Sequence, residues 1–402
     1  MTLSPPEAAI AERAAGEPML DWTKAWAEVN SGSANLAGLA EMARLLADAF
    51  AALPGEIELR DPAPHEAMAA DGSMRPVPHG RNLLVTVRPQ APVQLLLTGH
   101  MDTVFGAEHP FQTLDWLDEG VLNGPGVADM KGGLAVMLAA LKAIEAGDAA
   151  KRIGYQVMIN SDEETGSRGS AALIEEAARG KQAALTYEPA ARPDGTLAGE
   201  RPGSGNFSIR IRGRSAHAGR NPEDGRNAIL AASDLALKLA EAKSETLKVN
   251  PARIDGGGPA NVVPDHAILR VNMRPMRGED EARGRAALDE AVAAVAGAHD
   301  VEIELHGGFG RPPKPVDEKA AKLFALVRRC GADLGQDIGW QATGGVCDGN
   351  NIAACGVAVI DTMGARGGKI HSAEEYLIVE SLPERAALSA LVIARLAAGQ
   401  AR

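Results

Sequence analysis

Short apolar strands alternate with helices along the first half of the chain, and this alternation restricts the possible folds more than any other feature. The apolar patterns occupy residues 81–87, 93–98, 130–145, 152–160, 170–178 and 183–187. Of these segments, 130–145 and 170–178 are expected to be helices and the others strands. The alternation predicts a mostly parallel sheet flanked by helices, which is an α/β fold.

The α/β alternation of strands and helices stops after about residue 204 and resumes after residue 312. Between these points, strands and helices follow in the order β-α-β-β-α-β, at 206–213, 226–243, 246–254, 267–274, 279–296 and 301–305. This order predicts a ferredoxin-like α+β domain. Further α/β elements are expected at 318–334, 357–362 and 381–398. We therefore predict a discontinuous larger domain at 1–204 and 312–402, with a smaller domain inserted at 205–311.

The other segments give weaker patterns. Residues 21–53 are expected to be helical with an interruption at 30–33, and Asn35 is expected to cap the second of these helices. Residues 61–80 are rich in Pro, Ala, Gly and His and are expected to form a loop. Residues 106–128 are expected to be irregular.

Composition excludes several classes of protein. The 402 residues include 41 Lys and Arg against 53 Asp and Glu, a net charge of -12, which argues against nucleic acid as a partner. The three cysteines form no pairing pattern, which is typical of a reducing compartment. We find no signal-peptide pattern and no apolar run of about 18 residues, so we expect a cytoplasmic protein without membrane contact.

His100 and Asp102 directly follow the expected strand 93–98. Side chains two residues apart in a strand share a face, so both can point the same way. A carboxylate beside a metal-bound histidine commonly fixes the ring through its second nitrogen. Taken alone, the two residues fit a structural or solvent-exposed pair better than a metal site.

Four further segments carry acids or a histidine near strand ends. Asp129 ends a glycine-rich loop, where it can cap the next helix, bind a metal, or do both. Glu163 and Glu164 are adjacent, so one can bind a metal while the other carries a proton; an exposed acidic turn is the alternative. Glu188 follows an apolar strand, where burial is costly unless the acid is paired. His371 lies in a loop and indicates nothing alone.

The acids and histidines near the strand ends indicate more together than each one does alone. In an open α/β sheet, the carboxyl ends of the strands are where ligands bind. Two histidines with three carboxylates suit zinc, with cobalt or manganese as alternatives. A bridging carboxylate would allow these five side chains to hold two ions. The residues are His100, Asp129, Glu164, Glu188 and His371.

Several sequence blocks match a known family in order and spacing. They are GHMDTVF (99–105), GPGVADMKGG (124–133), NSDEETGSRGS (160–170), YEPA (187–190), RSAHAG (214–219), ANVVP (260–264), GRPP (310–313), TGGVCDGN (343–350) and KIHSAEEY (369–376). On these blocks the chain resembles the M20 metallopeptidases, in particular the glutamate carboxypeptidase branch. The resemblance implies a zinc-dependent exopeptidase-like α/β/α catalytic domain with an inserted ferredoxin-like lid that often dimerises.

The resemblance also implies roles for the metal-site residues. One zinc would be held by His100, Asp129 and Glu188, and the other by Asp129, Glu164 and His371. Glu163 would be the general base that works with a metal-activated water.

The same resemblance implies roles for residues that are not expected to bind metal. Asp102 would be the partner of His100. His217, in the lid, would reach the active site, expected to be that of the opposite subunit, and stabilise the oxyanion. Asn261, Arg274 and Arg311 match positions that hold the substrate's carboxylate end or support it. A homodimer formed through the lid follows from this reading.

The resemblance leaves the substrate open. An N-acyl amino acid or a C-terminal peptide bond is expected, with glutamate leading, and Glu188 in place of Asp favours the carboxypeptidase and deacylase branches. A deacylase for another N-acyl amino acid and a dipeptidase are the alternatives. TGGVCDGN departs from the usual glycine-rich stretch, so Cys347 and Asn350 leave the side-chain preference undecided. A non-catalytic binding protein should have lost a ligand or the base, and neither is lost.

Overall fold

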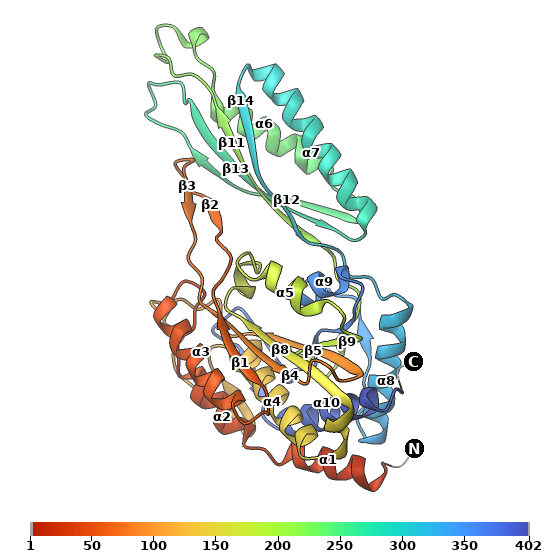
Figure 1. The fold of residues 1–402 in the computed structure, drawn as a ribbon. Helices are drawn as coiled ribbons and strands as arrows, with labels where there is room; N and C mark the ends of the chain where they lie inside the picture. Colours follow the sequence, from red (N-terminus) through yellow and green to blue (C-terminus); the bar gives the residue numbers. More distant parts are fainter. Residues whose placement is uncertain (1–2, 401–402) are drawn as a thin grey trace.

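The computed structural model describes residues 3–400 and consists of two parts joined by two chain crossings (Figure 1). The predicted domain ends at residues 1 and 402 lie outside this range. The strands of the larger part's main sheet are β1 (Glu56–Arg60), β4 (Asn82–Val87), β5 (Val93–His100), β8 (Ile153–Asn160), β9 (Ala183–Thr186) and β16 (Ala358–Ile360). The helices of this part are α1 (Pro5–Ala15), α2 (Met19–Ala27), α3 (Leu36–Phe50), α4 (Gly132–Glu145), α5 (Ala171–Ala178), α8 (Glu318–Asp333), α9 (Asp348–Ala354) and α10 (Ser381–Ala397).

The main sheet is mostly parallel, as the alternation of strands and helices predicts. Its order is β1-β4-β8-β5-β9-β16, and β8, β5, β9 and β16 pair in parallel. β4 runs against its neighbours β8 and β1. The reversal of β4 follows from its short connection to β5, because parallel strands need a crossover of about a dozen residues or more.

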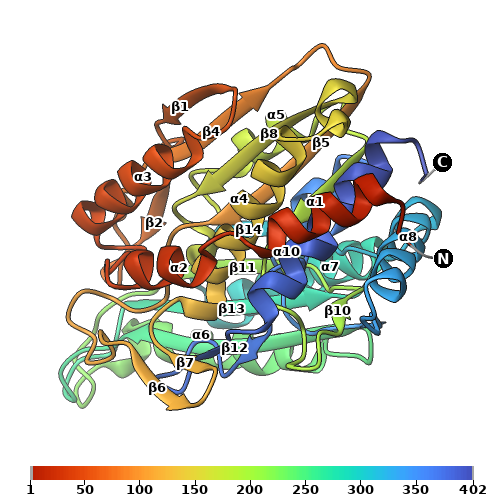
Figure 2. The ribbon, with the colours of Figure 1, turned by 90° about the horizontal axis from the view of Figure 1, so that it is seen from below.

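Helices cover both faces of the main sheet. Leu97 and Leu185 point into a large core with α1, α2, α3, α4, α8 and α10, whereas Leu96 and Ala184 point into a smaller core with α5 and α9. This division follows from the alternation of side chains along a strand. Seen from below in Figure 2, α1, α4 and α10 lie side by side over one face. The predicted α/β/α layering is confirmed.

The inserted part, here called the lid, has a sheet and a core of its own. Its elements are β11 (Ser204–Arg212), α6 (Ala228–Glu241), β12 (Leu247–Gly256), β13 (His266–Pro275), α7 (Gly278–His299) and β14 (Glu302–Arg311). The antiparallel order β12-β13-β11-β14 is ferredoxin-like, as predicted. Buried side chains of both helices and the sheet, among them Leu235, Leu288 and Leu269, form its core.

β14 is longer than the strand predicted at 301–305. Residues 306–311 lack alternating apolar residues, yet they pair with β11 as far as Arg311. The partner strand, not local preference, holds them extended. Because β11 begins at Ser204 and β14 ends at Arg311, the crossings lie close to the predicted boundaries. The division into functional domains at those boundaries stays a prediction.

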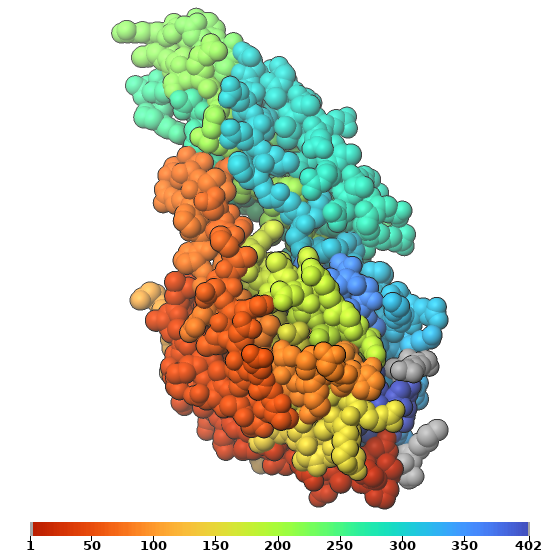
Figure 3. Space-filling model, viewed as in Figure 1, coloured from red at the N-terminus to blue at the C-terminus, as the bar shows by residue number. Residues whose placement is uncertain are grey.

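A hairpin of the larger part reaches the lid. The segment 61–80, expected to be a loop, contains β2 (Glu66–Met68) and β3 (Met74–Pro76). Arg270 Nη2 of the lid donates to the carbonyl oxygen of Met68 at 2.9 Å, and His266 Nε2 lies 3.3 Å from that of Ala70. Figure 3 shows this orange hairpin against the lid. The two parts therefore touch at the hairpin as well as at the crossings.

Other predictions need small corrections. Residues 106–128 are not wholly irregular, since β6 (Asp115–Asp118) and β7 (Val121–Asn123) join a small sheet with β17 (Gly367–Gly368) and β18 (Tyr376–Ile378). β10 (Leu197–Ala198) pairs with β15 (Trp340–Gln341). The sequence also missed α1 and β1; β1 is a charged edge strand without the apolar signal. Asn35 does cap α3, as predicted, by accepting from the Gly38 amide at 3.1 Å. Within residues 3–400, no helix is long and apolar enough to cross a membrane.

Candidate metal centre

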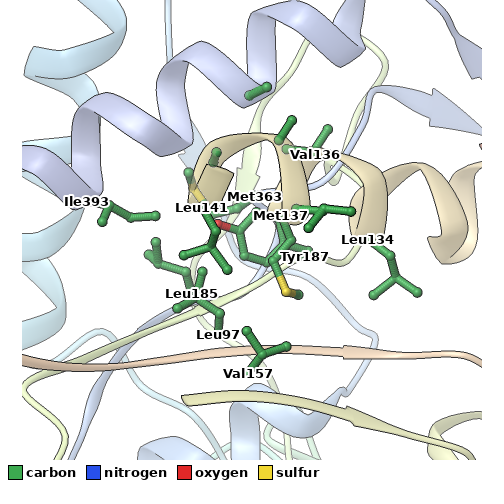
Figure 4. Close-up of a cluster of buried hydrophobic side chains, with 14 of the residues drawn as sticks. Leu97, Leu134, Val136, Met137, Leu141, Val157, Leu185, Tyr187, Met363 and Ile393 are labelled. Carbon is green, nitrogen blue, oxygen red and sulfur yellow. The ribbon is translucent and has the colours of Figure 1, made fainter. Parts of the chain in front are cut away.

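A buried core fixes the strand ends that carry the predicted site residues. Leu97 and Leu185, in β5 and β9, pack against helix α4 through side chains such as Met137 (Figure 4). At the start of α4, a Cβ on Gly133 would lie 2.0 Å from the carbonyl oxygen of Tyr187. Only glycine permits this approach, which brings the loop of Asp129 close to the residue that follows Tyr187, Glu188.

His100, Asp129 and Glu188 form the first half of a buried cluster. Nε2 of His100, the last residue of β5, lies 3.1 Å from Oδ1 of Asp129 and 3.8 Å from Oε2 of Glu188. The relative exposure of His100 is 1% and that of Asp129 is 5%. A histidine nitrogen and two carboxylates thus converge on one buried point.

The second half of the cluster lies on the other side of Asp129. Nε2 of His371 is 3.4 Å from Asp129 Oδ2 and 3.1 Å from Glu164 Oε2. The two oxygens of Asp129 therefore face two different groups, one containing His100 and the other His371. This is the arrangement that a bridging carboxylate requires. His371 itself has a left-handed backbone conformation, with φ of 63°, and its side chain is half exposed.

Asp102 ties the cluster to the neighbouring turn. His100 Nδ1 lies 3.0 Å from the backbone oxygen of Asp102 and 3.4 Å from its Oδ1. The same carboxylate accepts from the backbone amides of Glu163 and Glu164, at 3.1 and 3.2 Å. Asp102 thus orients the His100 ring, mainly through its carbonyl, and holds the turn that carries the two glutamates.

The loop of Asp129 differs from the predicted helix start. α4 begins at Gly132 and not at residue 130, and the preceding segment Val127–Lys131 has a non-helical backbone at Asp129 and Met130. Asp129 does not cap α4, since Lys131 occupies the cap position. This loop is held by the buried Glu375, which accepts from the backbone amides of Gly126, Ala128 and Asp129, at 3.0–3.2 Å.

Sequence reasoning missed the role of Glu375, although the residue lies inside the quoted block KIHSAEEY. The carboxylate is buried among amides contributed by a distant loop, and no local pattern reveals that contact. Glu375 orders the loop that presents Asp129 to the cluster.

Glu163 has a different environment from the other acids. Its Oε1 accepts from Arg311 Nη1 at 2.5 Å. Arg311 Nη2 also donates to Ser167 Oγ at 2.8 Å and to Asp348 Oδ1 at 3.2 Å. Arg311 is buried, and these contacts bind both of its terminal nitrogens. Arg311, which β14 carries to the larger part, thus positions Glu163, and its role in holding or supporting the substrate's carboxylate end stays a prediction.

Burial and crowding shift the pKa values of the cluster. Burial, and then the charge of Asp129, raises the pKa of Glu164 to about 7. Burial raises the pKa of Glu188 to about 8 against the opposing effect of His100. Hydrogen bonds to Asp129 and Glu164 raise the pKa of His371 to about 11. The carboxylates and histidines therefore share protons in the metal-free chain, as expected of a site that binds cations.

The donor set fits two divalent cations. Ligand atoms of His100, Asp129 and Glu164 all lie within 4.8 Å of one another, and so do those of His100, Glu163 and Glu188. Imidazole nitrogens with carboxylate oxygens are the ligands of zinc, cobalt and manganese sites.

Two cavities meet at the cluster, and both are lined by Glu163, Glu164 and His371. The first, about 510 Å³, extends past Glu188 and has mainly apolar walls; it is here called the apolar cavity. The second, about 700 Å³, lies between the larger part and the lid, and is here called the polar cavity. Its walls include Arg168, Ser204, Asn206, Asn250, Asn272 and Arg274. A molecule bound at the cluster would extend into both.

The structure places the predicted lid residues of the active site in two different regions. Arg274 lines the polar cavity and donates to the Gly344 carbonyl at 2.8 Å. His217 and Asn261 are exposed and lie together on the lid, where the Ala218 amide donates to the Asn261 carbonyl at 3.0 Å. Neither residue lines the two cavities. The structure of one chain therefore does not bring His217 or Asn261 to the cluster.

Comparisons with known proteins agree with this geometry. The model of Peptidase family M20/M25/M40 matches residues 96–395. Carboxypeptidase G2 from Pseudomonas sp. (strain RS-16) is 32% identical over 332 residues, covering 80% of this chain and 78% of that protein. A succinyl-diaminopimelate desuccinylase from Xanthomonas oryzae pv. oryzae (strain PXO99A) is 30% identical, covering 78% and 86%.

The fold has close structural neighbours too. A tripeptidase from Staphylococcus aureus subsp. aureus Mu50 superposes with a TM-score of 0.74 at 23% identity, covering 96% of this chain and 99% of that one. With the family match spanning most of the chain, the fold and the buried cluster have one common explanation. The chain belongs to peptidase family M20/M25/M40 and is a metallopeptidase-type hydrolase acting on C–N bonds.

Proposed function

We propose that this protein is a di-zinc hydrolase that cleaves the amide bond of an N-acyl amino acid or a C-terminal peptide bond, with glutamate as the leading leaving group. The observation that carries the proposal is the position of Asp129 between two ligand groups, with Glu163 beside them. His100 and Glu188 would hold one ion and Glu164 and His371 the other, with Asp129 shared. Cobalt or manganese would suit the same donors.

Divalent ions bound there would acidify water and polarise the scissile carbonyl. The chain's own contribution is proton transfer and positioning. Glu163 accepts the proton of the attacking water at a carboxylate oxygen and returns it to the leaving nitrogen. Arg311, which donates to the Glu163 carboxylate, and the Asp102 carboxylate, which accepts from the Glu163 backbone amide, hold Glu163 in place for both transfers.

We further propose that a second subunit supplies His217 and Asn261. Both residues are exposed and line neither cavity of their own chain, so a partner subunit or a movement of the lid would have to deliver them. Leu230 and Leu237, 59% and 68% exposed, lie seven residues apart on α6 and thus on one face. This apolar face supports a homodimer formed through the lid.

The relatives leave two substrate classes open. Carboxypeptidase G2 and a succinyl-diaminopimelate desuccinylase both resemble this chain, so a deacylase for another N-acyl amino acid is the second candidate. A free α-carboxylate is common to both classes, and Arg274 in the polar cavity suits it. The free thiols, Cys330, Cys347 and Cys355, fit the cytoplasmic location that we infer.

Hydrolysis of N-benzoyl-L-glutamate by zinc-loaded protein, followed by ultraviolet absorbance, tests the proposal. Turnover that a chelator abolishes and zinc restores is the expected result. A panel containing N-acetyl and N-succinyl amino acids separates the deacylase candidate. Protein that holds two metal ions and hydrolyses no member of the panel would contradict the proposed function.

A further inference from the structure

The polar cavity contains an arginine with no counterion. Arg168 lies in the loop between β8 and α5, is half-buried, and lines the cavity from the side of the larger part. Within residues 3–400, its guanidinium forms no salt bridge and no hydrogen bond. Burial, and then the charge of Arg311, lowers the pKa of Arg168. A partly buried, unpaired cation beside another cation is unfavourable and calls for an anion.

The backbone makes room for this guanidinium. A Cβ on Gly310, in β14, would lie 2.8 Å from Arg168 Nη1 and 3.1 Å from its Cζ. The arginine therefore lies directly against the lid strand that ends in Arg311, at the wall of the cavity. The nearby acids Glu163 and Asp348 accept from Arg311 and not from Arg168.

Two other arginines that line the cavities differ from Arg168, one because it has a carboxylate partner and the other because it lies on the lid. Arg201, in the apolar cavity, donates to Asp361 at 2.6 Å. Among the described residues, Arg274, on the lid side of the polar cavity, bonds only neutral acceptors, Asn272 Oδ1 at 3.1 Å and the Gly344 carbonyl at 2.8 Å. The polar cavity thus presents two guanidiniums that lack carboxylate partners, one from each part of the molecule.

We infer that Arg168 determines specificity by binding the side-chain carboxylate of an acidic leaving amino acid, while Arg274 binds its α-carboxylate. This inference rests on the proposed function. Amide groups of Asn206 and Asn272 and the hydroxyl of Ser204 line the same cavity and suit carboxylate oxygens. The apolar walls of the other cavity, such as Pro189 and Val346, then receive the acyl group. The substrate class is an N-acylated dicarboxylic amino acid.

A matched pair of substrates tests the role of Arg168. N-benzoyl-L-glutamate and N-benzoyl-L-glutamine differ only in the side-chain carboxylate. We expect wild-type zinc enzyme to prefer glutamate in kcat/KM by about 10–100-fold, since one charged hydrogen-bonded contact contributes that much. Arg168→Gln should abolish this preference, and Arg168→Lys should restore part of it. Arg179→Gln, an exposed arginine at the end of α5, controls for the loss of one charge and should keep the preference.

A binding measurement makes the inference independent of turnover. In calorimetric titrations with L-glutamate and L-glutamine, the metal-loaded wild type should bind glutamate more tightly, and Arg168→Gln should lose that difference. Equal losses for both substrates in Arg168→Gln, or a wild type without preference for glutamate, would overturn the role of Arg168 and leave the proposed function intact. If no N-acyl amino acid is hydrolysed, the proposed function fails, and the titrations still decide whether Arg168 binds the acid.

Discussion

The buried cluster and the exposed end of the lid differ in how their functional residues are held. His100, Asp129 and Glu188 are fixed by contacts within one chain, at strand ends supported by a packed core. His217 and Asn261 are exposed and belong to neither cavity of their own chain. The candidate metal site is therefore built by the folding of one chain, whereas the proposed oxyanion and carboxylate contacts depend on a second subunit.

The largest expected effect concerns Glu163, the cluster residue that is proposed to move protons. Glu163→Gln should lower kcat by about 10³–10⁴-fold, because a general base contributes up to this much. Bound zinc, measured by atomic absorption, should remain at the wild-type amount. Parallel loss of zinc and turnover would assign Glu163 to metal binding instead. Glu164→Gln is the matched comparison and should lose metal.

The next largest effect is expected at His217, on the exposed end of the lid. His217→Ala should lower kcat by about 10²–10³-fold, the usual effect of removing an oxyanion donor. Mixing this variant with Glu163→Gln should restore about a quarter of wild-type activity, since half the dimers are then mixed and each has one intact site. Subunit exchange is verified by native mass spectrometry. Proven exchange without recovery would show that His217 acts within its own chain.

A smaller effect is expected from Glu375, which holds the Asp129 loop. Glu375→Gln should weaken zinc binding by about 10–100-fold, because groups that orient metal ligands typically contribute this much. Competition with a chromophoric chelator measures the affinity. Glu374→Gln, its exposed neighbour, is the control and should bind zinc as the wild type does. Unchanged affinity in Glu375→Gln would mean that the loop is ordered without this carboxylate.

The remaining expected effect is a pH dependence of metal loading. The pKa values of Glu164 and Glu188 are raised to about 7 and about 8, so both bind protons below these values in the metal-free chain. Because bound metal requires ionised carboxylates, zinc affinity should rise from pH 6 to pH 8 by about tenfold per pH unit for each proton displaced. Calorimetry in buffers of different ionisation enthalpy counts the protons. An affinity independent of pH would contradict this description of the cluster.

Much of the site could be predicted because strand ends are visible in the sequence. The apolar runs before His100, Glu163 and Glu188 mark three parallel strands, and parallel strands end at one edge of a sheet. His371 had no such signal and was identified only through its motif. The motif of Arg311 indicated only that the residue holds or supports the substrate's carboxylate end, and the pairing of β14 with β11 is what brings it to Glu163. Long-range pairing of this kind leaves no local pattern.

The sequence by itself determined the α/β class and the ferredoxin-like insertion and indicated the candidate ligand residues, since periodicity and residue chemistry are local properties. Only the tertiary structure decided which groups meet. It placed Asp129 between two candidate ligand sets and gave Glu375 the amides of a distant loop. It also left Arg168 without a counterion among residues 3–400, in a cavity between two parts of the chain. Burial and charge balance arise from contacts between segments far apart in sequence, and those contacts exist only in the folded chain.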